Sequence, residues 1–134
     1  MDYETLRKWA NQGNPFMVHS GIQITDVGND CATAAADLTP ASTNLYGAAH
    51  GGFLFTMADC VTGMAAHSDG RHYVTLNSNF NFMRMAKKGT IVADAKVVKR
   101  GQTVVVVDVI VTCCDQELAS GTFTYFCLDA QNHE

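Results

Sequence analysis

The sequence predicts an α+β fold in which an antiparallel β-sheet wraps around one long helix. Residues 51–67 are almost uncharged and apolar nearly all round, which is typical of a helix buried on most of its sides. Four stretches with β-branched residues and strand-like alternation follow, at 73–85, 90–99, 103–114 and 117–128. A sheet wrapped around the helix is the simplest arrangement that buries it.

The first forty residues predict a short helix and two further strands. Residues 3–11 can form an amphipathic helix with Leu6, Trp9 and Ala10 on one side. Gly13 and Pro15 are expected to end it.

The two strands are expected at 21–27 and 31–38, because Gly28-Asn29-Asp30 between them is a turn signal. Alternation places Ile22 and Ile24, with Asp26, on one face of the first strand. The expected order is therefore helix, two strands, long buried helix and four strands.

Length and composition limit the classes of protein to which this chain can belong. The chain has 134 residues without an internal repeat, so we expect a single domain over 1–134. Charged residues make up only 16%, against a typical ~25%, which suggests that self-association covers apolar surface. The net charge of −4 argues against nucleic acid and anionic membranes as partners, and no uncharged apolar stretch is long enough to span a bilayer.

The cysteines and histidines predict neither disulfides nor a metal site, and no other cofactor is expected. The five Cys residues are odd in number and contain no CxxC. The histidines outside the motif described below, at 19, 67, 72 and 133, lack metal-ligand spacing. Free cysteines and an N-terminus without the apolar segment of a signal peptide indicate the cytoplasm.

Asp59 is the only charged residue of the long helix. An ionised carboxylate is costly inside a core unless it is paired or faces a cleft. Asp59 is therefore a candidate catalytic group. The structural alternative is that it lies on the helix's one wet stripe or caps a neighbouring loop.

His50-Gly51-Gly52 leads into the same helix. Two glycines at a helix start leave backbone N–H groups free, with no Cβ to block approach, and could hold the oxyanion of an acyl-transfer intermediate. Tight packing at a loop-to-helix junction would also favour glycines. Asp59 lies eight residues after Gly51, or ~12 Å along a helix, so a site that uses both predicts contributions from two subunits.

Most of the basic residues of this acidic chain are close together in the sequence. They are Arg84, Lys87, Lys88, Lys96, Lys99 and Arg100, with Asp94 as the single acid among them. An anionic ligand could bind there, although a pair of solvated strand ends would explain the same pattern.

Residues 43–59 resemble the signature of PaaI-type hotdog thioesterases. Their sequence is Thr-Asn-Leu-Tyr-Gly-Ala-Ala-His-Gly-Gly-Phe-Leu-Phe-Thr-Met-Ala-Asp. The family signature consists of Asn, then Gly, then His-Gly-Gly, and then Asp seven residues after the second Gly. The stretches 74–80 and 99–103 resemble the family's later strands, and the similarity runs from about residue 16 to residue 128. Where the family often has Arg-Pro-Ala, this chain has Arg84-Met85-Ala86.

The resemblance implies an acyl-CoA thioesterase that works as a dimer or as a tetramer built from two dimers, and it implies a role for each motif residue. Asp59 would be the nucleophile or the general base, with Thr75 beside it to orient water. Gly51, followed by Gly52, would supply the N–H for the thioester carbonyl, Asn44 would help to position that carbonyl or the base, and His50 would shape the turn into the helix. The phosphates of CoA would be bound by the basic segment, through Arg84, Lys87, Lys88, Lys99, Arg100 and Gly101.

The acyl group is left open between aromatic and medium or long aliphatic chains. Two other functions stay open. A hotdog dehydratase or hydratase would need a histidine acid/base near a carboxylate, and His50 before two glycines is a poor match. A non-catalytic acyl-CoA-binding module would have no need of Asp59.

Overall fold

The computed structural model describes residues 2–129 and contains one six-stranded, fully antiparallel sheet. The strands are β1 (Gln23–Gly28), β2 (Cys31–Asp37), β3 (Tyr73–Phe82), β4 (Thr90–Arg100), β5 (Val104–Cys113) and β6 (Gln116–Cys127). They are ordered β1-β2-β4-β5-β6-β3, which leaves β1 and β3 at the edges. In the described part of the chain, no helix is long and apolar enough to cross a bilayer.

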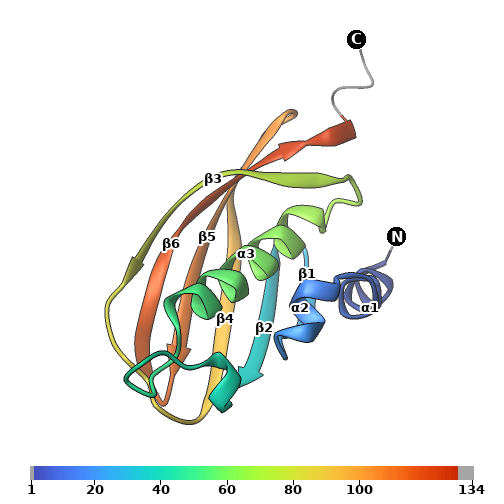
Figure 1. Cartoon of the computed structure of the whole chain (residues 1–134). Coiled ribbons are helices and arrows are strands. Elements are labelled where there is room, and N and C mark those ends of the chain that lie inside the picture. The colour runs from blue at the N-terminus through green and yellow to red at the C-terminus, as the bar shows by residue number, and fades with distance from the viewer. Residues whose placement is uncertain (1, 130–134) are drawn as a thin grey trace.

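The long helix α3 (Gly51–His67) lies in the concave face of this sheet, which curves around it (Figure 1). The predicted arrangement of a sheet around one apolar helix is confirmed. Two short helices, α1 (Tyr3–Gly13) and α2 (Pro15–His19), lie beside α3, and a 3-10 turn, η1 (Pro40–Ser42), precedes the loop into α3.

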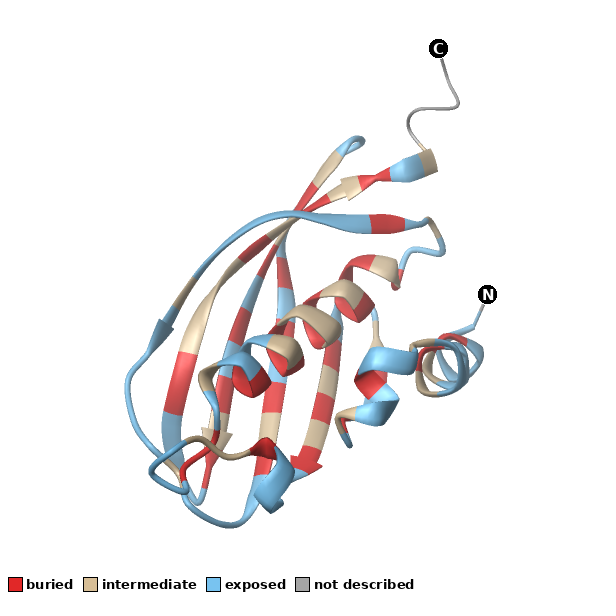
Figure 2. Cartoon of the chain, viewed as in Figure 1, coloured by how far each residue is buried: buried red, intermediate tan, exposed pale blue. Residues whose placement is uncertain are grey.

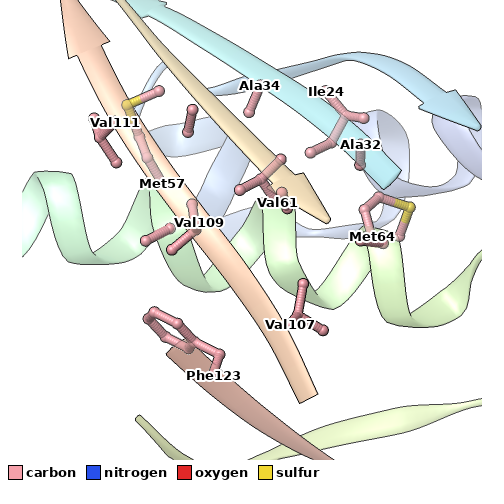
Figure 3. Packing of buried hydrophobic residues seen from close by; sticks show 14 of the residues in the cluster. Ile24, Ala32, Ala34, Met57, Val61, Met64, Val107, Val109, Val111 and Phe123 are labelled. Atoms are coloured by element: carbon pink, nitrogen blue, oxygen red, sulfur yellow. The ribbon is translucent and has the colours of Figure 1, made fainter. Parts of the chain in front are cut away.

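Small and branched side chains of the sheet cover the long helix. Ala32 and Ala34 of β2 and Val109 of β5 are buried among the residues that pack against α3 (Figure 3). Met57 and Val61 of α3 are fully buried against these strands. Buried and exposed residues alternate along β2, β4 and β5, as strands with one covered face require (Figure 2).

The N-terminal segment differs from the prediction. Pro15 does not simply end the first helix, because it is also the first residue of α2, where its fixed φ and missing N–H are tolerated. The Asn14 side-chain oxygen accepts from Met17 N–H at 3.2 Å and caps this second helix. Leu6 and Ala10 are buried as predicted, but Trp9 is 45% exposed.

Two strand details also differ. A bulge between Ile24 and Asp26 shifts the register of β1, so that Val27 is buried and Asp26 is exposed instead of sharing the face of Ile24. Strand β3 ends at Phe82, and the N–H groups of Met83 and Arg84 both donate to the carbonyl of Leu118. His133 lies outside the described residues.

Candidate active site

The carboxylate of Asp59 is half-buried on α3 and is held by one of its two oxygens. Thr75 Oγ1 donates to Asp59 Oδ1 at 2.7 Å, and the Tyr125 hydroxyl donates to the same oxygen at 2.9 Å. Within residues 2–129, Asp59 Oδ2 has no hydrogen-bond partner. One oxygen therefore fixes the orientation of the carboxylate, and the other is free to act on a ligand.

The sheet places both donors opposite Asp59. Thr75 of β3 and Tyr125 of β6 are directly paired across the two strands, so their side chains share the face that covers α3. A β-bulge follows Thr75 at once, between Thr75 and Asn77, and bulges commonly re-aim side chains next to active sites.

Tyr125 was missed in the sequence analysis. It is only 3% exposed, and its hydroxyl also lies 2.6 Å from the Asp59 carbonyl oxygen and 2.7 Å from Thr62 Oγ1. Burial, together with the Asp59 carboxylate, raises the pKa of Tyr125 well above its usual value, so the hydroxyl keeps its proton and remains a donor. The available signal was that Tyr125 alternates with Phe123 and Cys127 on an inward face, where a buried tyrosine needs a polar partner.

Cys60, beside Asp59 in the sequence, is not a competing nucleophile. Burial, and then the Asp59 charge, raise the pKa of its thiol to about 12. The reactive form of cysteine is the thiolate, so this thiol is inert near neutral pH. Asp59 is therefore the candidate reactive group on this face of α3.

The His-Gly-Gly turn has a defined geometry at the start of α3. His50 is the N-cap residue, and its Nδ1 accepts from Gly52 N–H at 2.8 Å. Gly52 N–H is thus occupied, whereas Gly51 N–H has no acceptor among the described residues. Asn44 Oδ1 accepts from the N–H groups of Tyr46 and Ala48 and so shapes the loop before the turn.

The structure brings Asp59 and Thr75 together but keeps them apart from Gly51. Gly51 is the first residue of α3, and Asp59 lies more than two turns further along, ~12 Å away. A single carbonyl group cannot contact both within one chain.

The basic segment is contiguous in the sequence but not in space. Lys87 and Lys88 precede β4, and Lys99 lies near its other end, ~30 Å away for a strand of this length. Arg84, Lys87 and Lys88 belong to the segment beside the His-Gly-Gly turn, where Ala49 N–H donates to the Ala86 carbonyl at 2.7 Å. Lys99 and Gly101 lie at the opposite end of the sheet.

Arg100 has a structural role in the fold. Its guanidinium donates to Asp30 Oδ1 at 2.8 Å, to Asp69 Oδ2 at 2.8 Å and to the carbonyls of Ala65 and Ala66 at the end of α3. We therefore correct its assignment: Arg100 ties the C-terminal end of α3 to β4 and leaves the set of candidate CoA ligands.

The antiparallel sheet wrapped around one long helix is a hotdog fold, and α3 presents one oriented carboxylate within it. The sequence model of the thioesterase superfamily matches residues 46–120, over half of the chain, and the chain therefore belongs to the thioesterase superfamily. The predicted hotdog fold and the predicted resemblance to PaaI-type thioesterases are confirmed, and the protein is a thioester hydrolase.

Three relatives are informative. The Mycobacterium tuberculosis protein Rv1847, provisionally named an esterase, is 33% identical over 94 residues, or 66% of this chain and 67% of its own. The phenylacetic acid degradation protein PaaI of Thermus thermophilus is 27% identical, with a TM-score of 0.82 over 86% of this chain and 100% of its own.

The third is a hypothetical thioesterase of Streptococcus pneumoniae, solved with coenzyme A. It is 30% identical, with a TM-score of 0.76 over 80% of this chain and 88% of its own. The same protein has also been solved with an aspartate replaced by alanine at its position 52 and with a threonine replaced by alanine at its position 68.

Proposed function

We propose that the protein hydrolyses the thioester bond of an aromatic or medium- to long-chain acyl-CoA, with Asp59 as general base or nucleophile. The observation that carries the proposal is the asymmetry of the Asp59 carboxylate. Oδ1 is held by Thr75 and Tyr125, while Oδ2 is free and the side chain faces a cavity. A positioned carboxylate with one free oxygen can take a proton from water or attack a carbonyl carbon.

As a general base, Asp59 Oδ2 removes a proton from water while the water oxygen bonds to the thioester carbon. The carbonyl oxygen becomes an oxyanion, which accepts a hydrogen bond from Gly51 N–H at the positive end of α3. Collapse of the intermediate breaks the carbon–sulfur bond, and the CoA thiolate takes up the proton held by Asp59, so that CoA thiol and the free acid are released. As a nucleophile, Asp59 would displace the CoA thiolate to form an anhydride, which water then hydrolyses to the free acid and the regenerated carboxylate.

The relatives support this assignment of residues. The two positions replaced in the S. pneumoniae thioesterase hold aspartate and threonine and are sixteen residues apart. Asp59 and Thr75 have the same identities and the same spacing. That thioesterase was solved with coenzyme A, which supports CoA as the carrier of the acyl group here.

The free edge of β3 supports a site shared by two subunits. Val74, Leu76 and Phe82 on this edge strand are 48%, 57% and 55% exposed, and an apolar edge of this kind invites pairing with another strand. The start of β3 lies beside Asp59, because Thr75 contacts it. The end lies beside Gly51, because the Phe82 ring is 3.5 Å from where a Cβ of Gly51 would be.

Two β3 strands paired antiparallel about a two-fold axis would place the start of each strand opposite the end of the other. Asp59 and Thr75 of one subunit would then face Gly51 of its partner. This arrangement would resolve the ~12 Å separation within one chain.

We expect a homo-oligomer, either a β3-paired dimer or a tetramer built from two such dimers. Analytical ultracentrifugation should give twice or four times the chain mass. Leu76→Glu, which places a charge on the exposed edge, should shift the protein toward monomer and reduce activity. Ile110→Glu, at an apolar position on β5 that is 48% exposed against 57% for Leu76, should not. An active wild-type monomer would contradict the shared site.

The cations near the His-Gly-Gly turn are expected to bind the phosphates of CoA. Lys87→Glu combined with Lys88→Glu should raise KM for an acyl-CoA at low salt by ~10-fold and change kcat little, since the lysines are expected to bind the phosphates and not the reacting carbonyl group. Lys8→Glu combined with Lys96→Glu reverses the same charge at two exposed lysines that are not candidate CoA ligands, and is the control. Equal KM values for the two double variants would assign the lysines to solvated surface.

A thiol-release assay across aromatic and aliphatic acyl-CoAs tests the proposed function directly. Release of CoA with at least one class supports it. Hydration of an enoyl-CoA without thiol release would favour a dehydratase or hydratase, and tight acyl-CoA binding without turnover would favour a binding module.

A further inference from the structure

A cavity of about 430 Å³ lies beside Asp59, between α3, the start of β3 and the two N-terminal helices. Its inner wall contains the catalytic group Asp59 together with Thr75 and Tyr125. Its outer wall is formed by α1 and α2, through residues that include Trp9, Pro15 and Met17 (the helices are seen beside α3 in Figure 1). The cavity therefore begins at Asp59 and extends under a segment whose second helix the sequence did not predict.

The charge of the lining restricts what the cavity accepts. Among residues 2–129, no lysine or arginine lines it, and Asp59 is its only acidic group. His67, at the far end, is kept neutral: burial lowers its pKa, and Nδ1 and Nε2 are engaged by the Gly63 carbonyl and by Tyr73 N–H. A ligand group that carries its own carboxylate would be desolvated there without a cation to pair with.

The shape of the cavity follows one face of α3. Asp59, Gly63 and His67 are four residues apart and line the cavity in succession over ~12 Å. Gly63 leaves space in the cavity along this face of α3, since a Cβ there would lie 3.3 Å from the Tyr125 hydroxyl. At the end, the Trp9 ring packs at 5.4 Å from the His67 ring while staying 45% exposed.

We propose that this cavity is the acyl subsite, that it takes uncharged, apolar acyl groups, and that Trp9 closes its far end and limits their length. The inference rests on the proposed thioesterase function, because the thioester carbon has to lie at Asp59 Oδ2. The acyl chain then runs over Gly63 toward His67, with Met17 and Met64 packing against its sides. Trp9 sits at the surface, where a longer chain would have to displace it.

Binding can be tested without turnover, because Trp9 is the only tryptophan of the chain. In the Asp59→Asn variant, octanoyl-CoA should change the intensity or wavelength of Trp9 emission, and CoA alone should not. Emission that responds equally to CoA and to octanoyl-CoA, or to neither at concentrations where calorimetry shows binding, would overturn the placement of the acyl group.

Selectivity is tested by kinetics on the wild type and two variants. The wild type should hydrolyse octanoyl-CoA with at least ~10-fold higher kcat/KM than suberoyl-CoA, which has the same chain length but ends in a carboxylate. Trp9→Ala should raise the kcat/KM ratio of palmitoyl- over octanoyl-CoA by ~10-fold, the scale of a single apolar specificity contact. Tyr3→Ala, an exposed aromatic of the same helix outside the cavity, is the control and should leave this ratio unchanged.

The outcomes separate the two proposals. An unchanged chain-length ratio in Trp9→Ala, or equal hydrolysis of octanoyl- and suberoyl-CoA, would overturn the acyl subsite while leaving the thioesterase function intact. Absence of thiol release from every acyl-CoA would overturn the proposed function. The fluorescence titration would then show by itself whether the cavity binds the acyl group.

Discussion

Asp59→Asn is expected to lower kcat by at least ~10²-fold, which is the effect of removing a general base or nucleophile. The amide keeps the shape of the carboxylate, and its oxygen can still accept from Thr75 and Tyr125, so the fold should be preserved. The amide nitrogen that replaces the free oxygen cannot accept the proton, because its lone pair is delocalised into the carbonyl group. KM should change little, because the lost interaction is made chiefly in the transition state.

Asp26→Asn is the matched control, since Asp26 is an exposed aspartate on β1 far along the chain from the site. It should keep wild-type kcat. Thiol release under saturating acyl-CoA measures both variants, and thermal unfolding checks that each is folded. Full activity of Asp59→Asn would remove the central residue of the hydrolase and favour a binding role.

The elements that position the site were predictable where local pattern and burial agree. The helix over 51–67 is correct to the residue, because its apolar composition and the glycines at its start are local signals. Asp59 could be singled out because a lone charge in such a helix demands a partner or a cleft. The four later strands were located from their β-branched residues and the turn signals between them, which are also local, and β4 and β5 show the alternation of strands with one covered face.

The rest of the site depends on contacts between distant residues. Tyr125 meets Asp59 only because β6 lies next to β3 in the sheet, a neighbour relation that strand patterns do not encode. Helix α2 was missed because Pro15 signals both a helix end and a helix start, and the Asn14 cap decides between them. The basic segment is an exception, because the strand predicted at 90–99 already separates its two ends and the structure has that strand as β4.

The shared site predicts that two inactive chains restore activity when they pair. Gly51→Pro should be inactive, because it removes the N–H expected to meet the oxyanion. It should still fold: Gly51 is the first helical residue, where proline is favoured, and His50 already has the extended conformation, with ψ of 136°, that a residue before proline needs. A new Cβ would meet the Phe82 ring at an ordinary 3.5 Å.

Equal amounts of Gly51→Pro and Asp59→Asn chains, co-refolded, should recover roughly a quarter of wild-type activity if two-fold dimers form at random. Half of the dimers would be mixed, and each mixed dimer would keep one intact site, made from Gly51 of one chain and Asp59 of the other. Circular dichroism and native mass spectrometry would confirm that the mixed dimer has formed. If both groups served the same chain, this mixture would stay inactive.

A second mixture makes the test symmetrical. A chain carrying both substitutions, co-refolded with an equal amount of wild type, should show about a quarter of the activity of an all-wild-type sample if the site is shared, because every mixed dimer then has two broken sites. If each chain had its own complete site, the wild-type chains would stay active in any partnership and about half would remain. Recovery in the first mixture together with the deeper loss in the second would place Gly51 and Asp59 of one active site on different subunits.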